Sequence, residues 1–308
     1  MSSDFLVIDV IWNILWWRMR KFLKYLVRDW LRLVLGRVNY VKLRFVLTHG
    51  YRCDLENPKT WNEKIQYRKL NTPPEKFSKF VDKFEVRKYV SDKIGIGYLI
   101  PLIAKFKIIS PSDFDDLPNQ FVIKTSNGGG GENVKIVYDK NNEDLKNLSE
   151  QFNGYLSNKI GSKIDELFYD IEEPYILIEK LMLDKNGQLP CDYKCHIFNN
   201  ETCKVFVQVD QGRFVNHCRS IYDENGLAQD FKIQPKYNVI PDFDFPENFS
   251  QLINQAKILA SEFDYVRVDM YLINGCVFFG EMTFCHGSGW EPVYPRESDK
   301  VLGSYWNP

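Results

Sequence analysis

Two stretches of the sequence combine residue types that could bind phosphate groups and a metal ion. The first is FVIKTSNGGGGENVKIV at 121–137, where Lys124 precedes four consecutive glycines: Gly128, Gly129, Gly130 and Gly131. Glycine weakens a helix or strand by about 0.5–1 kcal/mol per residue, and a tight hairpin needs only one or two. A flexible glycine hairpin can instead donate backbone N–H groups to phosphate oxygens, while the lysine adds a positive charge. An exposed hairpin without a ligand is the alternative.

The second stretch, VRVDMYLINGCVFFGEMT, carries two carboxylates on either side of a predicted hairpin turn at Asn274–Gly275. Asp269 lies five residues before the turn and Glu281 six residues after it. These spacings should bring the two side chains together across an antiparallel strand pair. Oxygen ligands of this kind suit Mg²⁺, which proteins usually share with substrate phosphates. A cross-strand ion pair with Arg267 is the alternative.

Composition and motifs exclude several classes of protein. The 308 residues allow about two domains, and the balance of 40 Lys+Arg against 41 Asp+Glu argues against a nucleic-acid-binding protein. Walker A, dinucleotide-binding and protein-kinase motifs are absent from the sequence. The seven cysteines are odd in number and form no CxxC pair, which predicts free thiols and a cytoplasmic protein. Cys191, Cys195 and His196 lack an evident fourth metal ligand.

The N-terminal segment differs from the rest in charge and pattern. Residues 1–45 hold nine basic and three acidic side chains, a net charge of +6. Apolar residues recur at spacings of three and four from Ile8 to Leu33, which predicts an amphipathic helix. The apolar run Phe5–Trp17 is too short to span a membrane, and its charges follow it, unlike those of a signal peptide. The pattern favours a helix on an anionic membrane surface through residues 5–35; packing on its own domain or on a second subunit is the alternative.

The remaining chain mixes helical and β-rich runs, which predicts an α+β fold. Thr60 and Glu63 form a capping box that should start a helix over 58–70. Further helices are expected at 81–94, 144–160 and 249–262. Strands are expected on both sides of the glycines, at 175–183, and in pairs that meet at Asn199–Asn200, Asn225–Gly226 and Asn274–Gly275.

Seven short motifs follow one another over roughly residues 57–304: TWNEKIQ, VDKFEVRKYV, LPNQFVIKTSNGGGG, IEKLM, DYKCHIFN, FDYVRVDMYLI and FGEMTFCHGSG. In this order they resemble the TupA-like ATP-grasp family, which is linked to teichuronopeptide and surface-polysaccharide (capsule) biosynthesis. The resemblance implies an ATP-grasp fold, in which two α+β subdomains clamp ATP, behind the amphipathic helix. The expected segments are a basic helix (1–46), a helical cap region (47–106), a subdomain with the phosphate loop (107–180) and a C-terminal subdomain with the metal and substrate sites (181–308).

The resemblance also implies a role for each matching residue. Lys83 and Lys124 would bind the ATP phosphates below a mobile loop at Gly128–Gly131. The adenine would lie against Glu179, Lys180 and Met182. Lys194 and Arg267 would act as the catalytic cations, with Arg267 steadying the transferred phosphoryl group.

For the metal, Mg²⁺ or Mn²⁺, the implied ligands are Asp269, Glu281 and Thr283. Thr283 stands where many ATP-grasp enzymes carry asparagine. The run HGSG at 286–289 is similar to a substrate loop, so His286 and Ser288 would contact the substrate.

The implied activity is that of an ADP-forming carboxylate–amine ligase, which makes an amide through an acylphosphate. It would join an amino acid or another amine to a cell-surface polysaccharide or its carboxylate-bearing precursor. The enzyme would be cytoplasmic, or peripheral at the inner face of the membrane if its first helix binds lipid. The alternatives are a phosphotransferase acting on a glycan hydroxyl, a glycosyltransferase, and a non-catalytic ATP-binding component of polysaccharide assembly. No nucleic-acid partner is expected.

Overall fold

The computed structural model describes the backbone of residues 3–129, 131, 133–212 and 216–308, and the side chains of its first helix from Leu26 onward. The chain divides into two compact units, Met1–Cys53 and Asp54–Pro308. The larger unit carries every residue predicted for the active site.

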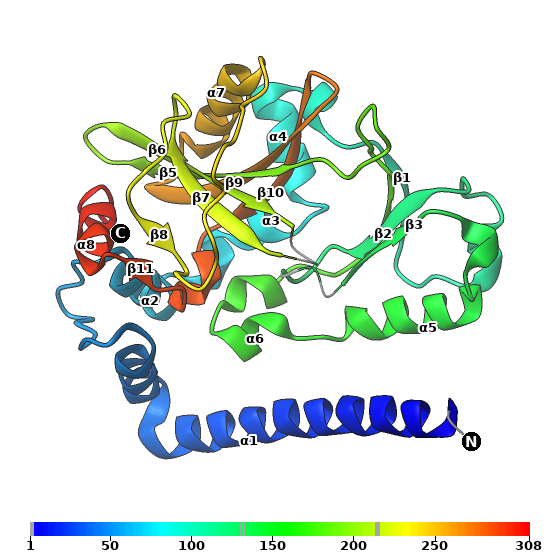
Figure 1. The fold of residues 1–308 in the computed structure, drawn as a ribbon, viewed down its shortest axis with the longest axis horizontal. Helices are drawn as coiled ribbons and strands as arrows, with labels where there is room; N and C mark the ends of the chain where they lie inside the picture. The colour runs from blue at the N-terminus through cyan, green and yellow to red at the C-terminus, as the bar shows by residue number, and fades with distance from the viewer. Residues whose placement is uncertain (1–2, 130, 132, 213–215) are drawn as a thin grey trace. The chain divides into compact units, whose positions relative to one another are not determined.

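The smaller unit is built on one helix, α1 (Ser3–His49), drawn in blue in Figure 1. Gly36 has φ 73° and ψ 161°, so the backbone leaves the helical region there and α1 is broken into two segments. Glycine accepts this conformation because it has no Cβ. After the break, the ring of Phe45 packs 4.2 Å from His49 and 5.1 Å from Tyr51. The predicted apolar stripe, which ends at Leu33, therefore belongs to the first segment.

The larger unit contains two antiparallel sheets (Figure 1). The four-stranded sheet has the order β1–β4–β2–β3 and consists of β1 (Leu102–Phe106), β2 (Phe121–Thr125), β3 (Val134–Val137) and β4 (Ile176–Lys180). The five-stranded sheet has the order β10–β9–β5–β6–β7 and consists of β5 (Asp192–Asn199), β6 (Cys203–Gln211), β7 (Cys218–Asp223), β9 (Tyr265–Ile273) and β10 (Cys276–Thr283). A short pair joins β8 (Lys232–Ile233) to β11 (Val293–Tyr294).

Helices cover both sheets and connect their strands. The α-helices are α2 (Trp61–Asn71), α3 (Ser78–Val81), α4 (Val86–Ile94), α5 (Leu145–Leu156), α6 (Ile160–Ile164), α7 (Phe249–Ala260) and α8 (Arg296–Ser304). The 3₁₀ turns are η1 (Pro74–Lys76), η2 (Ile96–Tyr98), η3 (Pro111–Phe114), η4 (Lys140–Asn142), η5 (Leu167–Asp170) and η6 (His286–Gly289). Helix α5 packs on β2 and β4, and α7 packs on β9 and β5 (Figure 1).

Each sheet has its own hydrophobic core. Phe114, Phe121 and Phe152 are buried beside the four-stranded sheet. A larger core, which includes Trp61 and Trp306, lies against the five-stranded sheet. Burial of apolar side chains on this scale is the main favourable term in folding. The combination of helices with antiparallel sheets confirms the α+β prediction.

The start of α2 is fixed both locally and by α8. The predicted capping box is present: Thr60 Oγ1 accepts from Glu63 N–H at 3.2 Å, and the Glu63 carboxylate accepts from Thr60 N–H at 2.9 Å. Asn62 N–H and its side-chain amide each donate to the Asp299 carboxylate at 3.1 Å. A Cβ on Gly303 would lie 2.1 Å from the Lys59 carbonyl oxygen, so only glycine permits this approach of the two helices.

Two predictions of secondary structure were wrong. The single helix expected at 81–94 is interrupted between α3 and α4, where the Asp82 carboxylate accepts from the N–H groups of Phe84 and Glu85 at 2.9 Å each and stabilises a turn. The strand expected after Asn225–Gly226 is reduced to an isolated bridge at Ala228. There, the Asp223 carboxylate accepts from the N–H of Asn225 in the turn and from the N–H of Leu227, which a strand ladder would otherwise use.

Candidate active site

The glycine run forms the predicted hairpin loop between β2 and β3. These strands pair from Phe121–Val137 to Lys124–Val134, and Asn133 Nδ2 donates to Thr125 Oγ1 at 3.0 Å to close the loop. Gly128 and Gly131 have φ of 83° and 80°, which favours glycine. Gly130 lies outside the described residues. Among the described glycines, these two therefore adopt a backbone that favours glycine, while the loop's contact with phosphate remains a prediction.

Lys83 connects the glycine loop with the second sheet. It lies in the turn before α4, where its N–H donates to the Ser126 carbonyl at 3.0 Å and its Nζ donates to the Gly128 carbonyl. Burial lowers the pKa of Lys83, and the charge of Glu281 on β10 opposes that shift. Lys83 thus binds the glycine loop and lies near enough to Glu281 for their charges to interact. The two predicted halves of the site are therefore close together.

Lys124 and Glu179 form an ion pair inside the four-stranded sheet. Lys124 Nζ lies 2.6 Å from Glu179 Oε2, and Arg87 Nη1 lies 3.3 Å from Glu179 Oε1. Lys180 is exposed and Met182 is half-buried just beyond the end of β4. In the described part of the chain, no hydrogen bond or ion pair joins these last two side chains to the other candidates. Their contact with adenine remains a prediction.

The five-stranded sheet brings the other candidates to one face. Side chains alternate along a strand, so Arg267 and Asp269 share a face of β9. Asp269 is paired with Lys194 on β5 and with Glu281 on β10, and Arg267 is paired with Thr283. The predicted meeting of Asp269 and Glu281 across the hairpin is confirmed.

A β-bulge at Gly280 makes this pairing compatible with the core. The register shifts between Phe279 and Glu281, so Phe279 faces the core while Glu281 faces the site. A Cβ on Gly280 would lie 2.9 Å from the Asp269 carbonyl oxygen. The bulge thus needs a residue without a side chain at this point.

The charges on this face form a compact network. Arg267 binds Asp269 through Nε at 2.6 Å and Nη2 at 2.8 Å, and Nη2 also reaches Glu281 at 3.0 Å. Lys194 Nζ donates to Asp269 at 2.9 Å and also contacts Asp192. The ion pair with Arg267, the alternative to a metal site, is therefore present in the structure. It does not exclude metal binding, because the same carboxylates can serve both.

The network shifts the pKa values of its members in opposite directions. Burial raises the pKa of Asp269, but Arg267 and Lys194 outweigh burial and hold this pKa below its usual range. Burial lowers the pKa of Lys194, but Asp269 and Asp192 outweigh it and hold this pKa above its usual value. Both groups are therefore charged at neutral pH.

The donor atoms fit a hard cation that is shared with a ligand. Asp269, Glu281 and Thr283 supply the oxygen ligands that Mg²⁺ prefers, and Glu281 keeps 34% of its side chain exposed. Among the described residues, no group of three or more His, Cys, Asp or Glu could hold a metal ion by itself. A cation here would need further oxygens, such as those of phosphates. The alternative set of Cys191, Cys195 and His196 forms no such group either.

His286 supports Arg267 from the substrate loop. Its Nδ1 lies 2.9 Å from Arg267 Nη1 and its Nε2 lies 3.1 Å from Glu291 Oε2. Arginine can only donate, so Nδ1 accepts and Nε2–H donates to Glu291. Burial lowers the pKa of His286, which agrees with a neutral ring. The ring also stacks on Trp61 at 5.4 Å.

Ser288 is held in an unusual backbone conformation. It has φ 54° and lies between Gly287 and Gly289, which also have positive φ. Its carbonyl oxygen accepts from Gln66 Nε2 at 2.9 Å and from Lys69 Nζ at 3.0 Å. Non-glycine residues in this region are strained, and such strain is concentrated at functional sites. The surroundings of Ser288 are thus compatible with its predicted contact with substrate.

Sequence reasoning missed four residues of this region: Arg87, Glu166, Tyr169 and Glu291. Arg87 lies in a quoted motif, four residues after Lys83, and this spacing was the one available signal. Glu166 accepts a hydrogen bond from Ser288 Oγ. The Tyr169 hydroxyl would lie 3.6 Å from a Cβ on Gly129. Glu166 and Tyr169 share one segment and Glu291 closely follows the HGSG run, but only their contacts with distant segments show that they belong to this region.

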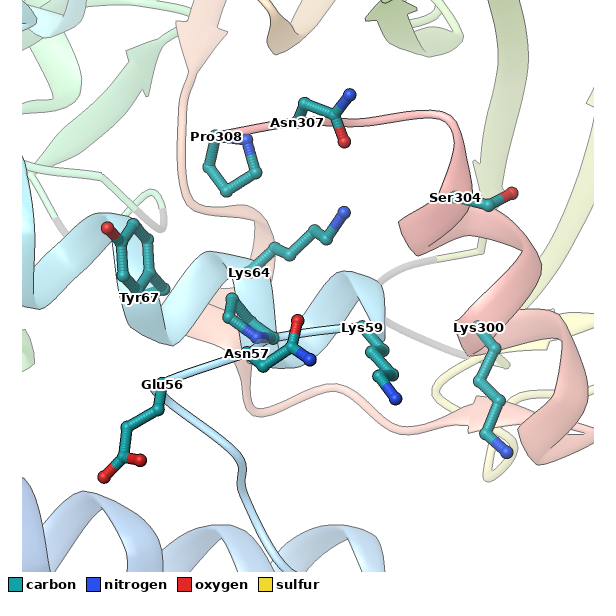
Figure 2. A pocket seen from close by; sticks show the side chains of 10 residues that line it. Glu56, Asn57, Lys59, Lys64, Tyr67, Lys300, Ser304, Asn307 and Pro308 are labelled. Atoms are coloured by element: carbon teal, nitrogen blue, oxygen red, sulfur yellow. The ribbon is translucent and has the colours of Figure 1, made fainter.

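A pocket of about 610 Å³ lies elsewhere, between the start of α2 and the end of α8. Figure 2 shows Lys59, Lys64 and Lys300 among its lining side chains. Lys64 Nζ is already bound to the Gly303 carbonyl at 2.9 Å. None of the predicted site residues lines this pocket, so it is separate from the site described above.

Comparison with known proteins bears on the whole larger unit. A family model described as TupA-like ATPgrasp matches residues 63–307. No curated protein matches the chain.

The chain is similar to solved structures of ligases at low sequence identity. D-alanine–D-alanine ligase from Helicobacter pylori is 17% identical over 74% of this chain and 61% of its own, with a TM-score of 0.42. Phosphoribosylamine–glycine ligase from Thermotoga maritima is 14% identical over 68% and 49%, with a TM-score of 0.41. D-alanine–D-alanine ligase from Bacillus anthracis, complexed with ATP, is 16% identical over 74% and 65%, with a TM-score of 0.38. The chain thus spans less than two thirds of the length of each of these ligases.

Proposed function

The chain belongs to the TupA-like ATP-grasp family, and from this premise we propose that it is an ATP-dependent carboxylate–amine ligase that releases ADP. The observation that carries the proposal is the convergence of Lys83, the glycine loop and the charged face around Arg267. Cations and backbone N–H groups on one side of a site, with metal-compatible carboxylates on the other, suit the handling of a nucleotide's phosphates.

In the proposed reaction, the protein supplies position and charge rather than a nucleophile. Lys83 and Lys124 hold the phosphates of ATP, and the loop at Gly128–Gly131 closes over them to exclude water. A cation bound at Asp269, Glu281 and Thr283 would neutralise charge on the phosphates.

Arg267 then stabilises the negative charge that develops as the substrate carboxylate takes the phosphoryl group. His286, neutral and fixed between Arg267 and Glu291, holds the guanidinium in its orientation. Lys194 donates a hydrogen bond to Asp269, and its positive charge keeps that carboxylate ionised. An amine next attacks the acyl carbon, phosphate leaves and an amide forms.

For the substrates, we propose an amino acid or another amine and a carboxylate-bearing sugar of a cell-surface polysaccharide or its precursor. This finer assignment is supported by the family alone. We place the substrate carboxylate near Arg267, because this guanidinium is the cation that would neutralise it beside the half-buried Glu281.

The test is release of ADP and phosphate from ATP with Mg²⁺, against a matrix of amino acids and uronic acids. We compare wild type with Glu281→Ala, and with Glu201→Ala as the matched control in the exposed β5–β6 turn of the same sheet. A ligase requires both an acid and an amine, and loses at least a hundredfold in rate in Glu281→Ala but nothing in Glu201→Ala.

Other outcomes contradict the ligase. Release of ADP with a hydroxyl compound and without free phosphate indicates a phosphotransferase. Tight ATP binding without turnover for any pair of substrates indicates a non-catalytic component.

We also propose that α1 binds an anionic membrane surface. Leu26, Trp30 and Leu33 lie at helical spacings on one face, and Trp30 and Leu33 are 61% and 84% exposed. The described part of α1 also carries Arg28 and Arg32 before the break at Gly36 and Arg37 after it; their positive charges complement anionic lipid. No helix in the described part of the chain is long and apolar enough to cross a membrane.

Flotation of the full chain with phosphatidylglycerol vesicles tests this surface. Leu33→Asp should abolish flotation, while Leu227→Asp, the same change at an exposed leucine of the larger unit, should leave it intact. Equal flotation of both variants would remove α1 as the membrane contact. If Leu33→Asp instead converts an oligomer to a monomer in the absence of vesicles, the helix binds a second subunit.

A further inference from the structure

Glu166 is a buried carboxylate that the reaction described so far does not use. It precedes η5 and retains only 2% of its accessible surface. Its Oε1 accepts from Ser288 Oγ. Among the described residues, the one hydrogen bond to this carboxylate is made to Oε1, and none is made to Oε2. Oε2 can therefore accept from another donor.

The position of Glu166 links it to the reacting groups from two sides. On one side, Ser288 lies two residues after His286, which contacts Arg267 at 2.9 Å. On the other side, Tyr169 of the same turn lies beside Gly129 of the glycine loop. Glu166 is therefore at the junction of the substrate loop and the phosphate loop.

The surroundings keep the carboxylate weakly acidic although cations are near. Burial raises the pKa of Glu166 to about 7, while Lys69 of α2, Ser288 Oγ and Arg267 of β9 oppose that shift and Asp165 supports it. Tyr169 and Cys285 are also near the group: burial raises the pKa of each, and the charge of Glu166 raises it further. A base with a pKa near the working pH transfers protons most efficiently.

We propose that Glu166 is the base that removes a proton from the attacking amine, with Ser288 fixing the orientation of its carboxylate. The inference rests on the proposed ligase reaction and identifies the residue that prepares the amine for attack. The strained backbone of Ser288, tied down by Gln66 and Lys69, serves this orientation.

The proton balance of the step is complete. The amine enters as an ammonium ion and transfers one proton to Glu166 Oε2, which frees the nitrogen lone pair. The nitrogen attacks the acyl carbon and a C–N bond forms. The bond between the acyl carbon and the bridging oxygen of the acylphosphate then breaks. Its electron pair stays on the leaving phosphate, which takes the second proton of the nitrogen. Glu166 returns its proton to water.

The experiment compares two nucleophiles in the wild type, in Glu166→Gln and in Glu172→Gln. Glutamine at 166 keeps an oxygen for Ser288 but cannot accept the proton. Glu172 is the matched control, because its carboxylate also holds a serine hydroxyl, that of Ser78 at 2.5 Å. The nucleophiles are hydroxylamine and the best amine from the substrate matrix, each with the same acid. Hydroxylamine is largely uncharged at neutral pH and needs no base to expose its lone pair.

We expect the ratio of amide to hydroxamate formed to fall about a hundredfold or more in Glu166→Gln. The ratio should be unchanged in Glu172→Gln. If both products fall by the same factor in Glu166→Gln, the residue only holds the two loops together and the inference is wrong, while the ligase stands. If wild type forms neither product with any acid, the proposed function itself fails and the inference with it.

A second measurement does not depend on substrates. The infrared difference between wild type and Glu166→Gln should contain the band of a protonated carboxylic acid that disappears near pH 7. Ionisation of Glu166 in the ordinary range of glutamate, near pH 4, would overturn the assignment.

Discussion

Replacing Gly128 with alanine tests whether the conformation of the glycine loop is required. Gly128 has φ 83°, and a Cβ there would lie 2.4 Å from Ile160 Cδ1 on α6. The left-handed conformation costs an L-residue about 1–2 kcal/mol. Moving the end of Ile160 off its rotamer costs about 0.5–1.5 kcal/mol more. Loss of glycine's freedom in the unfolded chain offsets about 0.4–1 kcal/mol.

The expected net loss is therefore about 0.5–3 kcal/mol in the free energy of unfolding, measured by urea denaturation. The double variant Gly128→Ala, Ile160→Ala separates the two terms, because it removes the clash and keeps the strained φ. Gly154→Ala on α5 is the matched control. No atom lies within 4 Å of its added Cβ, so alanine there should stabilise the helix by up to about 1 kcal/mol.

The same variant should weaken ATP binding, since the loop must also close over phosphates. Isothermal titration with ATP and Mg²⁺ measures this effect. If Gly128→Ala is as stable as wild type and binds ATP equally well, the loop does not need its left-handed glycine and the reasoning about its backbone is refuted.

Three further predictions concern stability. Thr60→Ala removes the helix cap and should cost about 1 kcal/mol in thermal unfolding; an unchanged melting temperature would show that α8 alone fixes α2. Burial raises the pKa of Asp210, but the charge of Arg219 outweighs burial and lowers this pKa to about 2. The ionised Asp210 therefore stabilises the fold at any pH above its unfolded pKa of about 4. The stability gap between wild type and Asp210→Asn should therefore shrink as the pH falls from about 4 towards 2, and a constant gap in urea titrations would contradict this. Glu166 has a raised pKa, so its effect on stability runs the other way: the fold is most stable below about pH 4 and loses stability as the pH rises to 7. In urea titrations the free energy of unfolding of Glu166→Gln should therefore match that of wild type at pH 4 and exceed it by roughly 3 kcal/mol at pH 8.

The sequence predicted those parts of the site that depend on local pattern. The Asn274–Gly275 turn and the alternation of strand residues were sufficient to bring Asp269 and Glu281 together. Their unequal spacing from the turn is now explained by the bulge at Gly280. A bulge inserts one unpaired residue and changes which face the following side chains occupy. Gly280 within the strand run was a signal for it that the spacing argument did not use.

Other parts depend on contacts between distant segments. Ser288 and Glu166 are separated by 122 residues, and their hydrogen bond depends on how the chain just before η5 approaches η6. No periodicity reports such a contact. The interruption of the 81–94 helix had a weak local signal, since Asp82 is a residue type whose side chain binds nearby backbone N–H groups.

The junction of α2 and α8 has a consequence for the order of events during synthesis. The bond between Asn62 and Asp299 spans 237 residues, and Trp61 shares its core with Trp306. At about 5–20 residues per second, a ribosome needs on the order of ten to fifty seconds to add that length of chain. Throughout this interval Trp61 has no native partner from α8. The nascent chain should therefore remain sensitive to protease around α2 until α8 has left the ribosome.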